Sequence, residues 1–537
     1  MNVTSTTPEV VITITGDFKQ LNAFGNNRAV STNGFGVWVP SQGNWLRNLN
    51  LPVGGMDGVL SSSVIGVPGG YDLYGGAVVS SALGASGAAT YSSSLGPFPI
   101  KIQPSTSTTS SKTKRSSLFS STLSGVVTGA FDLNNNRNIT ILGGHFTAQA
   151  TNGSTIHNLL FIDGKNNDTV AGLGSEISEQ STFVALGLQG DNLFAGGEVS
   201  GTVNGAQVQG LISYNLATNK YNGQPPPLTG GDSTVSAIAV RPDSQDVYVG
   251  GSFLSAGSLD CPAVCFFSTA SGQWNPPGQN LDGTVNTLLW ATASKLIAGG
   301  NMTVNNTAST SLAFYDPSKS TWDSYAGSEK LPGPVDVVSA ASSDGNQLWV
   351  AGTATNGSVY LMRHDGNDWT SAGQTLEPGT NIRGLQMFSL TKDHDSTPLV
   401  APNQALMLTG SIVLAGFGSA SAVLFNGTSF EPFALTTNTG NTAGALSHMF
   451  TERQNFFTDD HHHMKLVFVV LIGLAIALAL ILLLILAGLL LDRIRKKREG
   501  YMPAPTSMYD RGSGMQRIPP EELLGQLGKN PRQTPQI

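Results

Sequence analysis

The sequence predicts an all-β fold made of repeated four-stranded units. A glycine pair, reduced to one glycine in later copies, recurs after a short apolar run. Its second position falls at Gly144, Gly197, Gly251, Gly300, Gly352 and Gly410. The steps between these glycines are 53, 54, 49, 52 and 58 residues, a drifting period typical of repeat architectures. No useful helical periodicity precedes residue 465.

Each repeat has the same order of strand-like segments. An apolar run such as "VSAIAV" is followed by a turn signal, the glycine-pair strand, a loop and a second apolar run. An aromatic residue then opens a fourth strand, at Tyr221, Trp274, Trp322 and Trp369. Four short strands per ~50 residues predict kelch-like β-propeller blades, with a β-sandwich or a β-solenoid as alternatives. The glycines are expected to let backbones crowd near the ring centre or adopt positive φ.

The predicted repeat region covers residues 1–435, and its first 100 residues are a less regular version of the pattern. Residues 104–122, "PSTSTTSSKTKRSSLFSST", are rich in Ser and Thr and predict an exposed loop or linker. Residues 436–465 are expected to form a polar juxtamembrane stalk.

Residues 466–491 form an apolar run of 26 residues without a charge. About 20 such residues suffice to cross a bilayer as a helix, and no polar face marks this one as a buried core helix. A basic cluster follows, made of Arg493, Arg495, Lys496, Lys497 and Arg498. The positive-inside rule therefore predicts a cytoplasmic tail over residues 492–537 and an exported N-terminal region.

Sequons for N-glycosylation support this orientation. They occur at Asn2, Asn138, Asn152, Asn167, Asn301, Asn305, Asn356 and Asn426, and all precede the apolar run. Each is weak alone, but most are expected in loops between strands, where glycan attachment is sterically possible.

The chain has two cysteines, Cys261 and Cys265, in "LDCPAVCFF". In an oxidising compartment a local disulfide is expected, and two free thiols are the alternative. Two thiols without a nearby His make a metal site a poor interpretation.

Charge and motifs argue against nucleic-acid binding and catalysis. Residues 492–537 carry nine Lys/Arg and five Asp/Glu, a net +4, so the total of −7 leaves −11 on the rest. A body of that sign does not suit a nucleic acid. The chain has no Gly-X-Ser-X-Gly, phosphate loop or His-Glu-X-X-His motif, and the run His461–His463 fits a solvated spacer better than a metal site. No enzyme activity, catalytic residue, cofactor or metal is predicted.

Six features of the C-terminal part of the chain form a familiar set: "DCPAVC", "GGNMTVNNT", "FYDPSKSTW", the single apolar run, "YMPAPTSMYD" and "RIPPEELL". Together they resemble the C-terminal region of the fungal cellular morphogenesis proteins, the Rax family of bud-site-selection membrane proteins, in its larger second member. The resemblance spans about residues 120–525. Family members are longer and carry an N-terminal signal peptide, which "MNVTSTTPEVVITITGDF" does not resemble. This chain is therefore expected to be the C-terminal part of a longer protein.

The resemblance implies a non-enzymatic landmark at the plasma membrane or cell cortex of growth and division sites. It also implies a smaller multi-spanning membrane partner and cortical polarity proteins. The tail is expected to be disordered and to bind partners through short motifs, one of which suits an amphipathic helix. The candidate residues are Tyr501, Pro503, Pro505, Arg517, Ile518, Pro519, Pro520, Glu521, Glu522, Leu523 and Leu524.

Two functional hypotheses follow. The first is a glycosylated, single-pass landmark for polarised growth, bud-site selection and morphogenesis. The alternative is an anchored propeller that binds or modifies wall glycans, for which a pocket lined by several carboxylates or His would be the discriminating feature.

Overall fold

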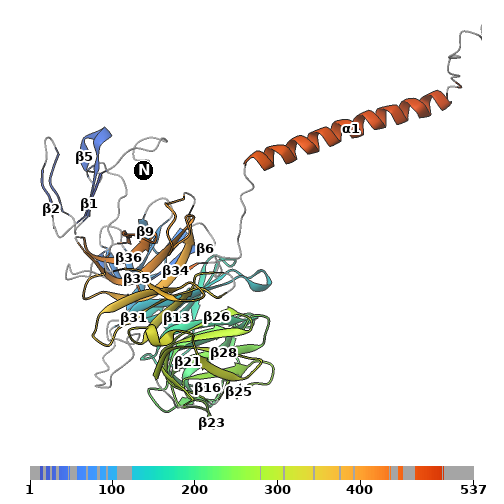
Figure 1. Cartoon of the computed structure of the whole chain (residues 1–537). Coiled ribbons are helices and arrows are strands. Elements are labelled where there is room, and N and C mark those ends of the chain that lie inside the picture. Colours follow the sequence, from blue (N-terminus) through green and yellow to red (C-terminus); the bar gives the residue numbers. More distant parts are fainter. Residues whose placement is uncertain are drawn as a thin grey trace, which may run out of the picture. The chain divides into compact units, whose positions relative to one another are not determined.

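The computed structural model describes residues 12–15, 20–23, 27–31, 35–45, 48, 57–67, 71–80, 85–91, 95–105, 124–278, 280–305, 309–342, 345–373, 376–390, 393–415, 417–434, 436, 445–451, 466–498 and 500. The chain divides into two compact units, Met1–Asp459 and Asp460–Ile537, which are treated separately below. Figure 1 shows the sheets of the first unit and the single long helix of the second.

Within the described residues, seven sheets of the first unit are each built on four antiparallel strands, called here blades 1 to 7 in chain order. Blades 1 to 3 contain β6 (Asp57–Val67), β7 (Tyr71–Ser80), β8 (Ala85–Tyr91) and β9 (Leu95–Pro97); β11 (Gly125–Asp132), β12 (Ile139–Gln149), β13 (Thr155–Asp163) and β14 (Thr169–Gly172); and β15 (Thr182–Gln189), β16 (Asn192–Val203), β17 (Ala206–Asn215) and β18 (Lys220–Tyr221). Blades 4 and 5 contain β20 (Thr234–Val240), β21 (Asp246–Ser252), β24 (Val264–Ser268) and β25 (Gln273–Asn275); and β26 (Leu281–Thr292), β27 (Lys295–Val304), β28 (Ser309–Asp316) and β29 (Thr321–Ser324). Blades 6 and 7 contain β30 (Val335–Ala340), β31 (Leu348–Thr353), β32 (Val359–His364) and β33 (Trp369–Ser371); and β34 (Asn381–Ser389), β35 (Gln404–Leu414), β36 (Gly418–Phe425) and β37 (Phe430–Ala434).

Shorter elements complete the first unit. The additional strands are β1 (Ile12–Thr15), β2 (Gln20–Leu21), β3 (Val30–Ser31), β4 (Phe35–Val39), β5 (Asn44–Trp45), β10 (Ile102–Pro104), β19 (Leu228–Thr229), β22 (Ser255–Ala256), β23 (Leu259–Asp260) and β38 (His448–Thr451). Three 3-10 turns are η1 (Pro40–Gln42), η4 (Asn134–Asn136) and η5 (Ser328–Lys330).

The blades pack against one another in chain order. Each first strand contacts the first strand of the next blade, from β6 through β11, β15, β20, β26 and β30 to β34, and β38 contacts both β34 and β6. Apolar side chains of neighbouring blades fill the space between them; one cluster, for example, joins Ile297 and Leu312 of blade 5 to Val335 and Val350 of blade 6. This arrangement confirms the predicted β-propeller and places its main cores between the blades.

The second glycine of each pair is required by a bulge in the neighbouring strand. At Gly300, an added Cβ would overlap the backbone carbonyl oxygen of Thr284. The first strand of blade 5 is bulged at this point, between Val285 and Thr287. The same overlap with a backbone carbonyl at the first strand occurs at Gly144, Gly197, Gly251, Gly352 and Gly410. The repeated glycine therefore allows close approach of two backbones within one blade.

The first glycine of the pair has a different function, because it makes room for the next blade. A Cβ at Gly299 would lie 2.7 Å from the Cγ1 atom of Val335 in blade 6. Similar approaches to a valine of the following blade occur at Gly75, Gly196 and Gly250. Blades 6 and 7 have Ala351 and Thr409 at this position, so the first glycine tolerates replacement where the second does not.

The ring is closed by β38, which lies in the segment that the sequence predicts as a stalk. It pairs in parallel with β6, from His448 beside Ser62 to Thr451 beside Ile65. The preceding residues attach to blade 7, where the Leu446 amide donates to the Gly410 carbonyl at 3.0 Å. Residues 445–451 therefore belong to the propeller, because they supply the contact between its first and last blades.

The aromatic residues that end the repeats pack in the interior. Trp322 is fully buried, and Trp274 and Trp369 are 8% exposed. The Trp274 indole Nε1 also donates to the Pro226 carbonyl at 2.9 Å, across the link between blades 3 and 4. Their burial confirms packing, rather than ligand stacking, as the function of these three rings.

In the second unit, α1 (Leu466–Arg498) has 33 residues. Within the described part of the chain it is the one helix long and apolar enough to cross a membrane. The helix continues seven residues past the apolar run and includes the basic cluster. Cationic side chains are favourable at a helix C-terminus, and Lys496 also pairs with Asp492 at 2.9 Å, one turn earlier.

Candidate functional site

The loops of the blades lie at two ends of the strands. The turns between first and second strands, and between third and fourth strands, share one end, called here the turn end. The loops between second and third strands, and the links to the next blade, share the other end, called here the linker end. This follows from the antiparallel order of every blade.

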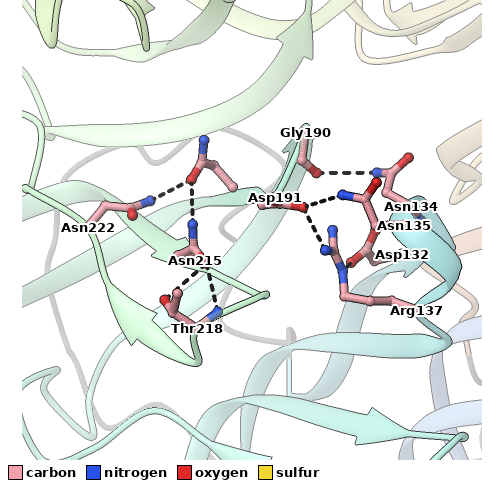
Figure 2. A network of polar contacts seen from close by, with 10 residues as sticks. Asp132, Asn134, Asn135, Arg137, Gly190, Asp191, Asn215, Thr218 and Asn222 are labelled. Atoms are coloured by element: carbon pink, nitrogen blue, oxygen red, sulfur yellow. Dashed lines mark hydrogen bonds and ion pairs between the residues drawn. The ribbon is translucent and has the colours of Figure 1, made fainter.

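A polar network joins blades 2 and 3 at the turn end (Figure 2). The buried Asp132 carboxylate accepts from the Arg137 Nε and from the Asn134 amide at 3.1 Å. Arg137 also donates through Nη1 to the Asp191 Oδ1 at 2.6 Å, and the Asn135 Nδ2 donates to the same oxygen at 3.0 Å. The hydrogen bond to Asp132 raises the pKa of Arg137, and the bond from Arg137 lowers the pKa of Asp191. The network holds the two turns together.

The neighbouring turns continue this contact with uncharged groups. The Gln189 Nε2 of blade 3 donates to the Ser244 carbonyl at 3.3 Å and to the Gln245 Oε1 at 3.1 Å, both in blade 4. These bonds show that the turn ends of successive blades lie side by side. Sequence reasoning missed the Asp132–Arg137–Asp191 group, because Asp191 is 54 residues from Arg137 and the three residues share no motif.

The described sequons lie at both ends of the blades. The side chains of Asn152, Asn167, Asn301, Asn305 and Asn356 are exposed, and those of Asn138 and Asn426 are half-buried. Asn2 lies outside the described residues. The exposed group is open to modification, but nothing in the structure tests whether a glycan is present.

Three sequons share one local geometry. In Asn152-Gly-Ser, the Asn Oδ1 accepts from the Ser154 amide at 3.0 Å and from its hydroxyl at 2.7 Å. The same pair of bonds recurs at Asn356 and at Asn426. Such Asx turns explain why Asn followed by Gly occupies these hairpins, so the sequons there also have a structural role.

Cys261 and Cys265 lie at the start of β24, directly after the β22–β23 hairpin. The structure places their sulfur atoms within bonding distance, with Cα atoms 5.7 Å apart. Both residues are buried, at 2% and 0% exposure. A bridge would fix the base of this hairpin, which among the described blades is an addition particular to blade 4.

The histidines that the structure describes do not converge on a metal site. No group of three or more His, Cys, Asp or Glu able to hold a metal ion occurs among the described residues. His145 is buried, and its Nδ1 lies 3.1 Å from the Ser181 carbonyl of blade 3, so it packs between two blades. His364 lies against the Trp369 ring, with centroids 4.8 Å apart. The run His461–His463 lies outside the described residues.

The clefts of the described residues are poor in catalytic groups. One cleft of about 950 Å³ lies beside blade 2, with a floor that includes Phe98, Ile162 and Val170. It has one carboxylate, Asp168, and no His. A second cleft of about 640 Å³ lies on blade 3 and has one carboxylate, Glu176. Neither is the pocket of several carboxylates or His that glycan hydrolysis would require.

The predicted basic residues all lie in the last turns of α1, where they form one cationic helix end. The predicted partner-binding residues of the tail, from Tyr501 to Leu524, lie outside the described residues. They remain a hypothesis based on the sequence.

Comparison with known proteins supports the interpretation of the fold and motifs. Residues 211–461 match the family described as the Rax2 C-terminal beta propeller domain. The chain is 42% identical, over its whole length, to "Polarized growth protein L1" of Phoma sp., of which it covers 41%. The predicted resemblance to the Rax family is confirmed. Other Rax-family relatives are "Polarized growth protein RAX2" of Candida albicans, 23% identical over 56% of this chain and 23% of its own length, and "Polarized growth protein rax2" of Schizosaccharomyces pombe, 23% identical over 40% and 19%.

The Rax-family match covers part of the ring seen here. It begins inside β17, whereas the blades begin at Asp57. Among solved structures, the extracellular domain of a putative hybrid two-component system, BT3049 of B. thetaiotaomicron, covers 57% of this chain and 34% of its own at 11% identity and a TM-score of 0.34. That likeness is too low to support an argument. The chain spans less than half the length of the Rax-family relatives it matches.

Proposed function

We propose that this chain is the membrane-anchored part of a cortical landmark for polarised growth. The 42% identity to a polarized growth protein over the whole chain carries the proposal. In this account the propeller faces the cell exterior, α1 crosses the plasma membrane once, and the tail recruits polarity proteins in the cytoplasm. Bud-site selection and cell morphogenesis are the processes that such a landmark would serve.

The distribution of sequons and basic residues supports this orientation. All eight sequons precede α1, and the cluster from Arg493 to Arg498 ends it. Basic residues flanking a spanning helix favour the cytoplasmic side, while N-glycans are added in the secretory pathway. A smaller multi-spanning membrane protein and cortical polarity proteins are the proposed partners, on the basis of the family resemblance.

The alternative, a propeller that binds or modifies wall glycans, has less support. Sugar sites need aromatic platforms or paired carboxylates, and the two clefts on blades 2 and 3 have one aromatic ring and two carboxylates between them. No observation here favours that function over the landmark.

Deletion of residues 501–537 tests the proposal. The shortened protein should insert into the membrane and receive its glycans but lose its concentration at growth sites. Fluorescence microscopy of a propeller-tagged version measures the distribution, and a scrambled tail of the same composition is the control. Normal concentration and normal polarity after the deletion would contradict a recruiting function for the tail.

A further inference from the structure

Blades 3 and 4 form a stretch without sequons between two glycosylatable blades. No Asn-X-Ser/Thr occurs from Asp168 to Gly300, whereas blades 2 and 5 each have at least two. Blade 1 also lacks them. On an exported protein, this stretch would leave the polypeptide surface of blades 3 and 4 open to a partner.

The linker end of this stretch has carboxylates and no cations. Between residues 173 and 283 the basic residues are Lys220, which begins β18, and Arg241, which follows β20, and both lie at the turn end. The carboxylates of the linker end are Glu176, Glu179, Glu198, Asp232, Asp260 and Asp282, all exposed except the half-buried Glu198. The two ends of the same blades therefore differ in charge.

A groove of about 640 Å³ crosses the linker end of blade 3. Its wall offers hydrogen-bonding side chains from Glu176, Ser178, Thr202, Gln207 and Gln209, and Gly205 has open space where a side chain would lie. No aromatic ring lines it, so it offers no platform for stacking a sugar. Short polar side chains beside open backbone suit an extended polypeptide better.

Blade 4 presents an apolar position at the same linker end. Gly210, next to the groove residue Gln209, packs on Leu228 at the base of the β19–β22–β23 sheet. Gly230 in turn packs on Leu254, whose side chain is 51% exposed. Leu254, exposed in the loop before β22, offers an apolar contact at this end of blade 4.

We propose that the linker end of blades 3 and 4 is a docking surface for an extended, Lys/Arg-rich polypeptide segment with one aliphatic side chain on Leu254. The acidic rim selects the charge of the occupant, the groove hydrogen-bonds its backbone, and the hairpin of blade 4 presents the apolar contact. This inference rests on the proposed exported orientation, because the absence of glycans matters on the exported side.

Peptide binding to the full chain in nanodiscs tests the proposal. The probe is a fluorescein-labelled peptide of alternating Lys and Ser with a central Leu, and its control has Glu in place of each Lys. Fluorescence anisotropy should detect the first peptide alone. Replacing Glu176→Gln, Glu179→Gln and Asp232→Ser together should weaken binding about tenfold, since each exposed ion pair contributes roughly half a kcal/mol. The matched control, Asp243→Asn with Asp393→Asn and Glu431→Gln, removes equal charge elsewhere and should change it less than about twofold.

A glycan provides a second, independent variant. Asp232→Asn places an Asn-Ser-Thr sequon within the docking surface, because Ser233 and Thr234 follow, whereas Asp232→Ser does not. The glycosylated variant should lose peptide binding, and enzymatic removal of the glycan should restore it. Equal loss in the rim and control variants, or undiminished binding with the glycan attached, would overturn the docking surface. Failure of the orientation is distinguishable, because the whole protein would then carry no glycan.

Discussion

Blades 4 and 5 share their strand order and glycine pair, but blade 4 carries an additional hairpin. Gly251 and Gly300 occupy equivalent bulge positions in the two blades, and each lies against a first-strand carbonyl. Blade 4 inserts β22 and β23 between its second and third strands, with both cysteines and the exposed Leu254 around them. Features present in every blade stabilise the ring, whereas a feature of one blade is free to serve recognition.

The largest expected loss of stability concerns the ion-pair network between blades 2 and 3. Its loss would show that a feature of one pair of blades can also stabilise the ring. Arg137→Met leaves the Asp132 carboxylate, which has no exposed surface, without its cation. Loss of one partner of a buried ion pair costs about 4 kcal/mol, so the melting temperature should fall strongly. Thermal unfolding measures this. The control is Arg241→Met, whose contact with Asp246 is longer, at 3.8 Å, and part-exposed, and which should cost less than about 1 kcal/mol.

The two glycines of a pair should differ in their tolerance of alanine, which should be low at the second glycine and higher at the first. Gly300→Ala forces a methyl group onto the Thr284 backbone and should cost about 3 kcal/mol. Gly299→Ala meets the Val335 side chain and should cost about 1 kcal/mol. Denaturant unfolding of both variants checks the ranking. Combining Gly299→Ala with Val335→Ala should show a favourable coupling, because a Val335 methyl group at 2.7 Å is the nearest obstacle to the added Cβ, with the Thr287 methyl group at 2.8 Å as the second. Equal costs for the two alanines would contradict the bulge explanation.

The cysteine pair should matter less than Gly300. Replacing Cys261 and Cys265 together with alanine removes a small closed loop, for which chain entropy predicts about 2 kcal/mol. Both cysteines are buried, so thiol labelling must be done after denaturation without reductant. The wild-type protein should then remain unlabelled until it is reduced. Immediate labelling of both residues would show that the bridge does not form.

The smallest effect on stability is expected at the docking surface. Leu254→Ser removes a side chain that is half exposed and should change the free energy of unfolding by less than about 0.5 kcal/mol. The same variant should weaken binding of the Lys/Leu peptide. A large loss of stability would assign Leu254 to packing and remove the apolar contact from the proposal.

The repeated order of strand-like segments and turns made most of the fold predictable from the sequence. The regularly spaced glycine indicates close approach of two backbones, and the closing tryptophan indicates a buried position. Both features are local to one blade. Ring closure was not predictable, because β38 has a short, irregular sequence whose partner β6 is almost 400 residues earlier. Two further features depend on side chains that the ring brings together, so no local sequence pattern predicts them. They are the Asp132–Arg137–Asp191 network and the difference in charge between the two ends of the blades.

Orientation across the membrane is the claim on which the functional account depends most directly. Wall-less cells expressing the chain with a C-terminal tag can be treated with external protease and, separately, with N-glycosidase. The account predicts that protease removes the propeller but spares the tag, and that N-glycosidase increases the gel mobility of the intact protein. Loss of the tag, with no change of mobility after N-glycosidase, would contradict it.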